Sequence, residues 1–168
     1  VVVESVKRDG YAVLNADNKY CVRIGENASC NVAYFSSDEN NPIILEHCKT
    51  GGIAAIYENG YITIKKGDWK FRVEKATLIP LTFGGRVTFM IYNVLAATSM
   101  ALALHITPDV VRNALLLFHG VPGRLQEHIL TNGARCFIDY AHNPESFEAV
   151  LSTLRLLTHQ LIVLFGAG

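Results

Sequence analysis

The sequence has no excess of charge of either sign, because 15 lysines and arginines balance 15 aspartates and glutamates. Proteins that bind nucleic acids or anionic membranes usually present a basic surface, so the composition gives no reason to expect either partner. Long apolar runs are also lacking, since the hydrophobic stretches are too short or too interrupted to span a bilayer. We therefore expect no nucleic acid and no membrane among the partners.

Cysteines are few and scattered, and they are Cys21, Cys30, Cys48 and Cys136. They form no CxxC pair and no zinc-like cluster with histidine, so we expect reduced thiols and no metal site built from them. The first residues show no basic segment leading into an apolar one, which is the pattern of a secretory signal. Together these absences predict a cytoplasmic protein.

The first part of the chain contains short segments rich in aliphatic and aromatic residues, as strands are. The predicted strands are residues 11–14, 21–24, 31–35, 53–57, 61–65 and 69–73. Asn59-Gly60 separates two of them, and this pair is the strongest short-range signal for a hairpin. We expect the last three strands to form an antiparallel meander within a mixed sheet.

Three segments of this part have helical signals. Asn41-Pro42 and Thr107-Pro108 each place a capping residue before a first-turn proline, which predicts helices over residues 43–49 and 107–118. Residues 87–104 are rich in alanine and large apolar side chains, which predicts a buried helix. The Gly/Pro-rich stretch 120–123 then interrupts every pattern, and we expect a domain boundary that divides the chain into residues 1–121 and 122–168.

The last part reads as a βαβ unit. Residues 135–139 and 161–165 have the apolar content of strands, and Asn143-Pro144 has the pattern of a helix start. Ligands gather where strands end and helices begin, because free backbone N–H groups and the helix dipole point there. The segment 139–144 occupies that position and is the candidate binding site. The fold class is therefore α/β, with a mixed sheet followed by the start of a parallel one.

Three motifs carry a resemblance to one family. The segment Asp139-Tyr140-Ala141-His142-Asn143-Pro144 resembles the motif that opens the C-terminal domain of Mur ligases. Pro122-Gly123-Arg124 resembles the arginine-bearing linker of the same superfamily. Gly84-Gly85 followed by residues 89–97 is similar to the asparagine-bearing helix that closes the central ATPase domain. The resemblance implies that residues 1–121 are part of a Mur-type central domain and that residues 122–168 begin a Rossmann-like C-terminal domain.

The resemblance also implies a chemistry. Mur-type ligases use MgATP to phosphorylate a carboxylate, and an amine then attacks the acyl phosphate to give an amide. By this resemblance Arg124 is the catalytic residue, because a guanidinium is permanently charged and can bind phosphate oxygens in pairs. The same resemblance gives Asn93, Asp139, Tyr140, His142 and Asn143, together with Arg124, as nucleotide-binding residues.

Some parts of such an enzyme are missing from this sequence. No GxxxxGK[ST] segment is present, although this loop cradles the phosphates of ATP in the family. The magnesium ligands of the family are expected upstream of these residues, and we expect the 168-residue chain alone to be inactive. The implied partners are ATP and substrates with amino-acid or peptide-like carboxylates and amines, and homo-oligomerisation is left open.

Alternative interpretations remain at this stage. The chain could come from a Mur-type ligase of peptidoglycan-precursor or folylpolyglutamate synthesis, which differ in the acceptor and not in the ATP chemistry. It could also be a non-catalytic nucleotide-binding or assembly module. For the single residues, Asn143 fits a helix N-cap, Arg124 fits a solvated linker arginine and Asn93 fits a residue that bridges a helix start.

Overall fold

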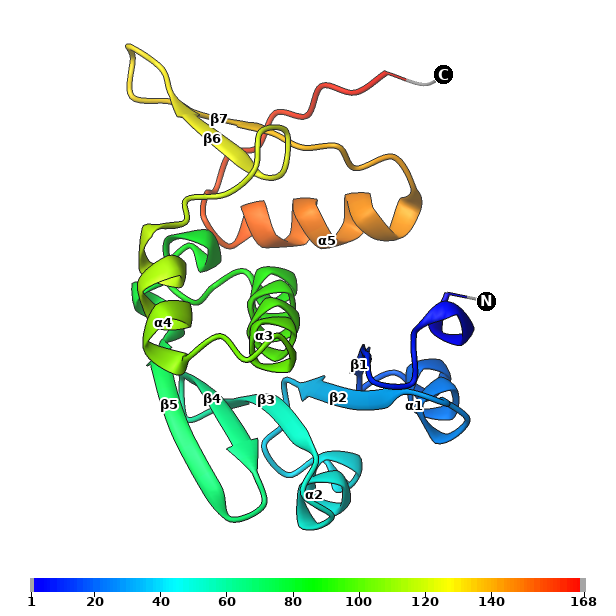
Figure 1. Cartoon of the computed structure of the whole chain (residues 1–168). Coiled ribbons are helices and arrows are strands. Elements are labelled where there is room, and N and C mark those ends of the chain that lie inside the picture. The colour runs from blue at the N-terminus through cyan, green and yellow to red at the C-terminus, as the bar shows by residue number, and fades with distance from the viewer. Residues whose placement is uncertain (1, 167–168) are drawn as a thin grey trace. The chain divides into compact units, whose positions relative to one another are not determined.

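The computed structural model describes residues 2–166 of the chain (Figure 1). The described residues divide into two compact units, of which the first ends at Phe118 and the second begins at His119. Each unit has its own sheet, with five strands in the first and two in the second. The domain boundary predicted after residue 121 stays a prediction.

The sheet of the first unit has the strand order β1-β2-β3-β4-β5. Its strands are β1 (Tyr11–Asn15), β2 (Asn31–Ser36), β3 (Ile53–Glu58), β4 (Tyr61–Lys66) and β5 (Trp69–Lys75). The first three strands pair in parallel, and β4 and β5 continue the sheet as an antiparallel meander. Asn59 and Gly60 have φ values of 52° and 82°, so both residues adopt the left-handed conformation that a tight hairpin turn needs. The predicted mixed α/β sheet is confirmed.

Helices cover both faces of this sheet. They are α1 (Lys19–Glu26), α2 (Pro42–Lys49), α3 (Thr88–Ala103) and α4 (Pro108–Leu117), with short 3-10 turns at η1 (Val3–Ser5), η2 (Ala76–Leu78) and η3 (Pro80–Thr82). Figure 1 shows α3 on one face of the sheet and α2 on the opposite face. One apolar core lies between the sheet, α3 and α4, and a second lies between β1–β3 and α2. Because α3 is buried against the sheet, it holds its side chains in fixed positions.

The strand predicted over residues 21–24 is wrong, because these residues belong to α1. Asn18 caps this helix, and its side-chain oxygen accepts hydrogen bonds from the backbone N–H groups of Tyr20 and Cys21 at 2.9 and 3.2 Å. This cap satisfies two of the N–H groups that a helix start leaves without partners. The apolar residues of the segment suggested a strand, but the capping interaction and the packing of one helix face decide the local structure.

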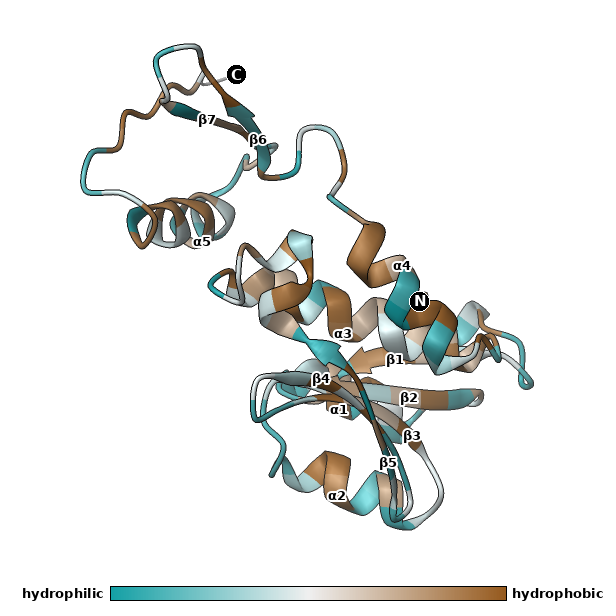
Figure 2. Ribbon diagram, turned by 90° about the vertical axis from the view of Figure 1, so that its left-hand side faces the viewer, coloured by the Kyte–Doolittle hydropathy of each residue, from teal (hydrophilic) through white to brown (hydrophobic). Residues whose placement is uncertain are grey.

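The second unit contains β6 (Gln126–Ile129), β7 (Arg135–Ile138) and α5 (Pro144–Arg155). The predicted strand before residue 139 and the helix that begins at Pro144 are confirmed, whereas β6 was not predicted. Strands β6 and β7 pair in antiparallel orientation. Figure 2 shows brown and teal stretches along α5, as expected for a helix with one apolar face. Leu154, one of the predicted apolar positions, is buried.

The strand predicted over residues 161–165 is also wrong, because residues 161–166 form no strand. A strand exists only where a neighbouring backbone pairs with it, and within the described residues β7 pairs with β6 alone. The side chains of Ile162 and Leu164 are accordingly 97% and 98% exposed. Ala167 and Gly168 lie outside the described residues.

Candidate functional site

The candidate site of the second unit begins with residues 121–126, which we call the Arg124 loop. Three hydrogen bonds of main-chain N–H groups hold it. The N–H of Arg124 donates to the Val121 carbonyl oxygen at 3.1 Å, and that of Gly123 donates to Oε1 of Gln126 at 2.9 Å. The N–H of Leu125 donates to Oδ2 of Asp139 at 2.7 Å. The last bond ties the loop to the end of β7.

Leu125 shows how tightly the loop is fixed. Its side chain is only 2% exposed, and its φ is 47°, which lies in the left-handed region that side chains other than glycine rarely adopt. Such a conformation costs a non-glycine residue about 1–2 kcal/mol and persists only where surrounding contacts determine it. The burial of Leu125 and its hydrogen bond to Asp139 are those contacts.

The segment 139–143 connects β7 to α5. Oδ1 of Asp139 accepts a hydrogen bond from the N–H of Ala141 at 2.8 Å, which closes a tight turn. Asn143 caps α5, because its Oδ1 accepts from the Ser146 N–H at 2.8 Å while Ser146 Oγ accepts from the Asn143 N–H at 3.2 Å. This reciprocal pair is a capping box, and it confirms the interpretation of Asn143 as a helix N-cap.

The structure brings Arg124 together with the 139–143 segment. The guanidinium carbon of Arg124 lies 5.1 Å from the centre of the Tyr140 ring, and the rings of Tyr140 and His142 are 5.4 Å apart. Nδ1 of His142 lies 3.0 Å from the carbonyl oxygen of Tyr140. All three side chains are exposed. A guanidinium over one aromatic face can bind a phosphate, and the neighbouring ring can stack on a planar group.

Asn93 belongs to the first unit and lies on α3, with its side chain exposed. Its Nδ2 is 3.6 Å from the sulfur of Met90, and among the described residues this is the side-chain partner that the structure gives it. The helix that carries Asn93 is firmly held, because the neighbouring Tyr92 bonds to Asp17 and Ser37 at 2.9 and 2.7 Å. Asn93 therefore presents its amide to solvent from a fixed helix.

Sequence reasoning missed the polar cluster around Asp17. Its Oδ1 accepts from Ser36 Oγ at 2.5 Å and Asn41 Nδ2 at 2.9 Å, and its Oδ2 accepts from the N–H of Ser37 at 2.8 Å and from Tyr92. Burial alone would raise the pKa of Asp17, but these hydrogen bonds outweigh it and lower the pKa below its usual value. The cluster joins the carboxyl ends of β1 and β2 to α3. The position of Asp17 just after the strand predicted over residues 11–14 was the signal that could have found it.

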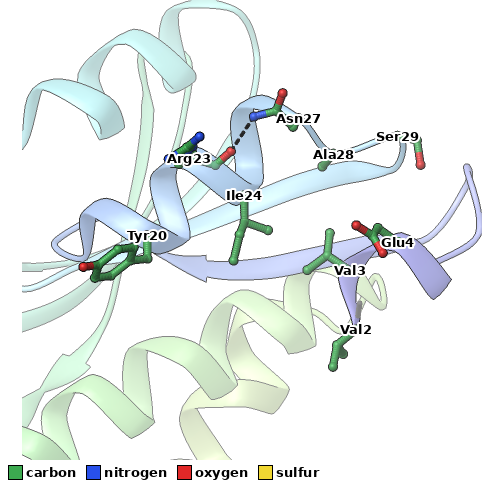
Figure 3. A pocket seen from close by; sticks show the side chains of 9 residues that line it. All are labelled: Val2, Val3, Glu4, Tyr20, Arg23, Ile24, Asn27, Ala28 and Ser29. Atoms are coloured by element: carbon green, nitrogen blue, oxygen red, sulfur yellow. Dashed lines mark hydrogen bonds between the residues drawn. The ribbon is translucent and has the colours of Figure 1, made fainter.

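One hollow of the first unit contains none of the predicted site residues. It has a volume of about 590 Å³ and lies between the first described residues and α1. Figure 3 shows Val3 and Ile24 near one another in it and the hydrogen bond from Asn27 to the carbonyl oxygen of Arg23. Its lining is mainly apolar, and the charged residues in it are Glu4 and Arg23.

Neither a metal site nor a membrane span is present in the part of the chain that the structure describes. Within residues 2–166, no three His, Cys, Asp or Glu side chains are grouped so that they could hold a metal ion. No helix of these residues is long and apolar enough to cross a membrane.

Comparison with known proteins tests the resemblance. Residues 123–168 match the family model described as "Mur ligase, glutamate ligase domain". Over 159 residues the chain is 45% identical to a cyanophycin synthetase of Trichormus variabilis. This alignment covers 92% of this chain and 18% of that protein. It is 30% identical over 168 residues to a UDP-N-acetylmuramoyl-L-alanyl-D-glutamate--2,6-diaminopimelate ligase of Syntrophomonas wolfei, with 96% of this chain and 31% of that protein covered. The predicted relationship to the Mur ligase superfamily is therefore confirmed.

Within that superfamily, the chain shares more residues with the cyanophycin synthetase than with the diaminopimelate ligase. It spans 18% of the length of the former, so it corresponds to a small part of that protein. A solved structure of a mutant of L. casei FPGS matches 90% of this chain and 44% of that chain, with 16% sequence identity and a TM-score of 0.42.

Proposed function

We propose that the chain is part of an ATP-dependent ligase that joins a carboxylate to an amine through an acyl phosphate. The observation that carries the proposal is the Arg124 guanidinium, held 5.1 Å from the Tyr140 ring on a loop that is hydrogen-bonded to Asp139. Phosphoryl transfer depends on positioned cations around the phosphates, and a fixed arginine supplies one. Arg124 is the proposed catalytic residue.

The other proposed nucleotide contacts follow from their exposure and position. Tyr140 lies beside Arg124 and His142 lies beside Tyr140, and their exposed rings suit stacking with the base or contact with the sugar of ATP. Asp139 and Asn143 lie in the same segment, and each carboxylate or amide oxygen has lone pairs beyond those used by its backbone partners. Asn93 is proposed as a further nucleotide contact, because its amide is exposed on a fixed helix.

We further propose that the substrates are those of cyanophycin synthesis, in which arginine is added to aspartate side chains of a polymer. The 45% identity to a protein of that name supports this choice over the 30% identity to a peptidoglycan ligase. Magnesium is the proposed metal, with ligands outside these residues, and the proposed location is the cytoplasm. The domain boundary after residue 121 belongs to the same proposal.

The test uses two proteins, the 168-residue chain and the full-length polypeptide that contains it. We expect the full-length protein to release ADP only when MgATP, an aspartate-containing acceptor and arginine are all present, and the 168-residue chain to release none. The variant Arg124→Ala should lower the rate about 100-fold or more, since loss of one positioned charge-stabilising group costs that much. An unchanged rate for Arg124→Ala, or no dependence on an amine, would refute the proposal.

A further inference from the structure

Asp139 joins the two segments that make up the candidate site. Its Oδ2 accepts the N–H of Leu125 at 2.7 Å, and its Oδ1 accepts the N–H of Ala141 at 2.8 Å. Leu125 follows Arg124 directly, and Ala141 follows Tyr140 directly. One half-buried carboxylate therefore holds the backbone next to the guanidinium and the backbone next to the ring on which that guanidinium lies.

Two interactions join the Arg124 loop to the segment after β7: the hydrogen bond between Leu125 and Asp139, which lie 14 positions apart, and the contact of Arg124 with Tyr140. Main-chain N–H groups bond to the Asp139 carboxylate on one side, and the Arg124 side chain lies over Tyr140 on the other. A hydrogen bond to an ionised carboxylate is roughly twice as strong as a neutral one. It is therefore strong enough to help keep Leu125 in its left-handed conformation at φ 47°. Without this bond, the loop that carries Arg124 loses the contact that fixes its direction.

We propose that Asp139 is a positioning residue that fixes the Arg124 loop so that the guanidinium meets the phosphates of ATP. This inference rests on the proposed function, and it deepens it by giving Asp139 a role that does not depend on contact with the nucleotide. Both oxygens of this carboxylate are engaged by main-chain N–H groups, so its orientation is set by the loop and the turn that it joins. Any remaining lone pair of Asp139 is still able to accept a bond from a sugar hydroxyl.

The first measurement uses the 168-residue chain and NMR of backbone amides. We expect the Leu125 N–H proton to resonate downfield, because it donates to a carboxylate oxygen at 2.7 Å. In Asp139→Ala the downfield shift of the Leu125 N–H proton is lost, and the side-chain protons of Arg124 lose the upfield shift that the Tyr140 ring gives them. If Asp139→Ala fails to fold, Asp139→Asn takes its place. It keeps one acceptor oxygen, so the two signals should change by less than a full loss. The matched control Glu148→Gln removes an exposed carboxylate of α5 and leaves both signals unchanged.

The second measurement uses the full-length protein and the rate of ATP-dependent amide formation. A misplacement of about 1 Å can lower a rate 100-fold, so Asp139→Ala should lower kcat by roughly that factor. Because both changes act on one guanidinium, the double variant Arg124→Ala/Asp139→Ala should be within about threefold of Arg124→Ala alone.

The outcomes separate this inference from the proposed function. A Leu125 signal that is unaffected in Asp139→Ala, or losses that multiply in the double variant, would overturn the positioning role while Arg124 could still be catalytic. An unchanged rate in Arg124→Ala would overturn the proposed function, whatever the amide signal of Leu125 shows.

Discussion

Gly25 lies in α1 where the helix meets Tyr34 of β2 closely. A Cβ atom added at Gly25 would lie 2.0 Å from the Tyr34 hydroxyl oxygen, 2.9 Å from Cζ of the same ring and 3.2 Å from Cδ1 of Leu14. Tyr34 is 6% exposed, and its ring packs edge-to-face on His47 with the centroids 4.9 Å apart. The tyrosine therefore has little room to move away from a new methyl group.

The substitution Gly25→Ala should destabilise the chain. Overpacking of a filled core costs about 1–3 kcal/mol, and the better helix propensity of alanine returns about 1 kcal/mol. We expect a net loss of up to about 2 kcal/mol in the free energy of unfolding, measured by urea denaturation followed by circular dichroism. In the Tyr34→Phe background the closest atom is gone, and the loss caused by Gly25→Ala should shrink by at least half.

The control Arg23→Ala changes an exposed side chain of the same helix and should alter the stability by less than about 0.5 kcal/mol. If Gly25→Ala made the chain more stable than the wild type, helix propensity would outweigh packing at this position. The close approach of α1 to β2 would then be refuted.

The other predictions concern buried polar groups. Thr63 is fully buried, and its Oγ1 lacks a hydrogen-bond partner among the described residues, so Thr63→Val should raise the unfolding free energy by about 1 kcal/mol. Thr82 is equally buried, but its Oγ1 donates to the carbonyl oxygen of Ile79 at 2.9 Å. Thr82→Val should therefore lower the unfolding free energy by about 1–3 kcal/mol. Equal effects of the two substitutions in urea denaturation would contradict this reasoning. A hydrogen bond from the Lys75 N–H lowers the pKa of the Glu74 carboxyl, and so does Arg112, whose Nε lies 2.9 Å from Oε2 of Glu74. A carboxyl whose pKa is lowered in the folded state stabilises the fold fully at pH values above its ordinary pKa of 4.5. The free energy of unfolding that Glu74→Gln loses at pH 7 should therefore shrink as the pH falls below 4.5. A loss that does not change with pH would contradict this reasoning. Asp17→Asn should show the same pH dependence below the ordinary value of 3.8, because the pKa of Asp17 is also lowered, and Asp9→Asn at an exposed site is its control.

Local signals in the sequence predicted much of the fold. The Asn59-Gly60 turn, the proline-marked helix starts at Pro42 and Pro108, and the cap at Asn143 each act over a few residues, and the structure contains all of these elements. Two predicted strands were wrong for different reasons. Residues 21–24 follow a cap at Asn18 that favours a helix, and residues 161–165 have no neighbouring strand among the described residues with which to pair.

The candidate site was predictable only as a set of residues. Motifs identified Arg124 and the 139–143 segment, but no local pattern could show that the Leu125 N–H reaches Asp139 across 14 positions. The left-handed conformation of Leu125 was equally hidden, because a leucine gives no sign of it as a glycine would. The Asp17 cluster joins residues 75 positions apart, and such contacts depend on the tertiary fold.

The most direct test of the account is a crystal structure of the full-length protein with magnesium and a non-hydrolysable ATP analogue. We expect the Arg124 guanidinium to lie within hydrogen-bonding distance of a phosphate oxygen while Asp139 still accepts the N–H of Leu125. An ordered triphosphate that Arg124 does not contact would contradict it.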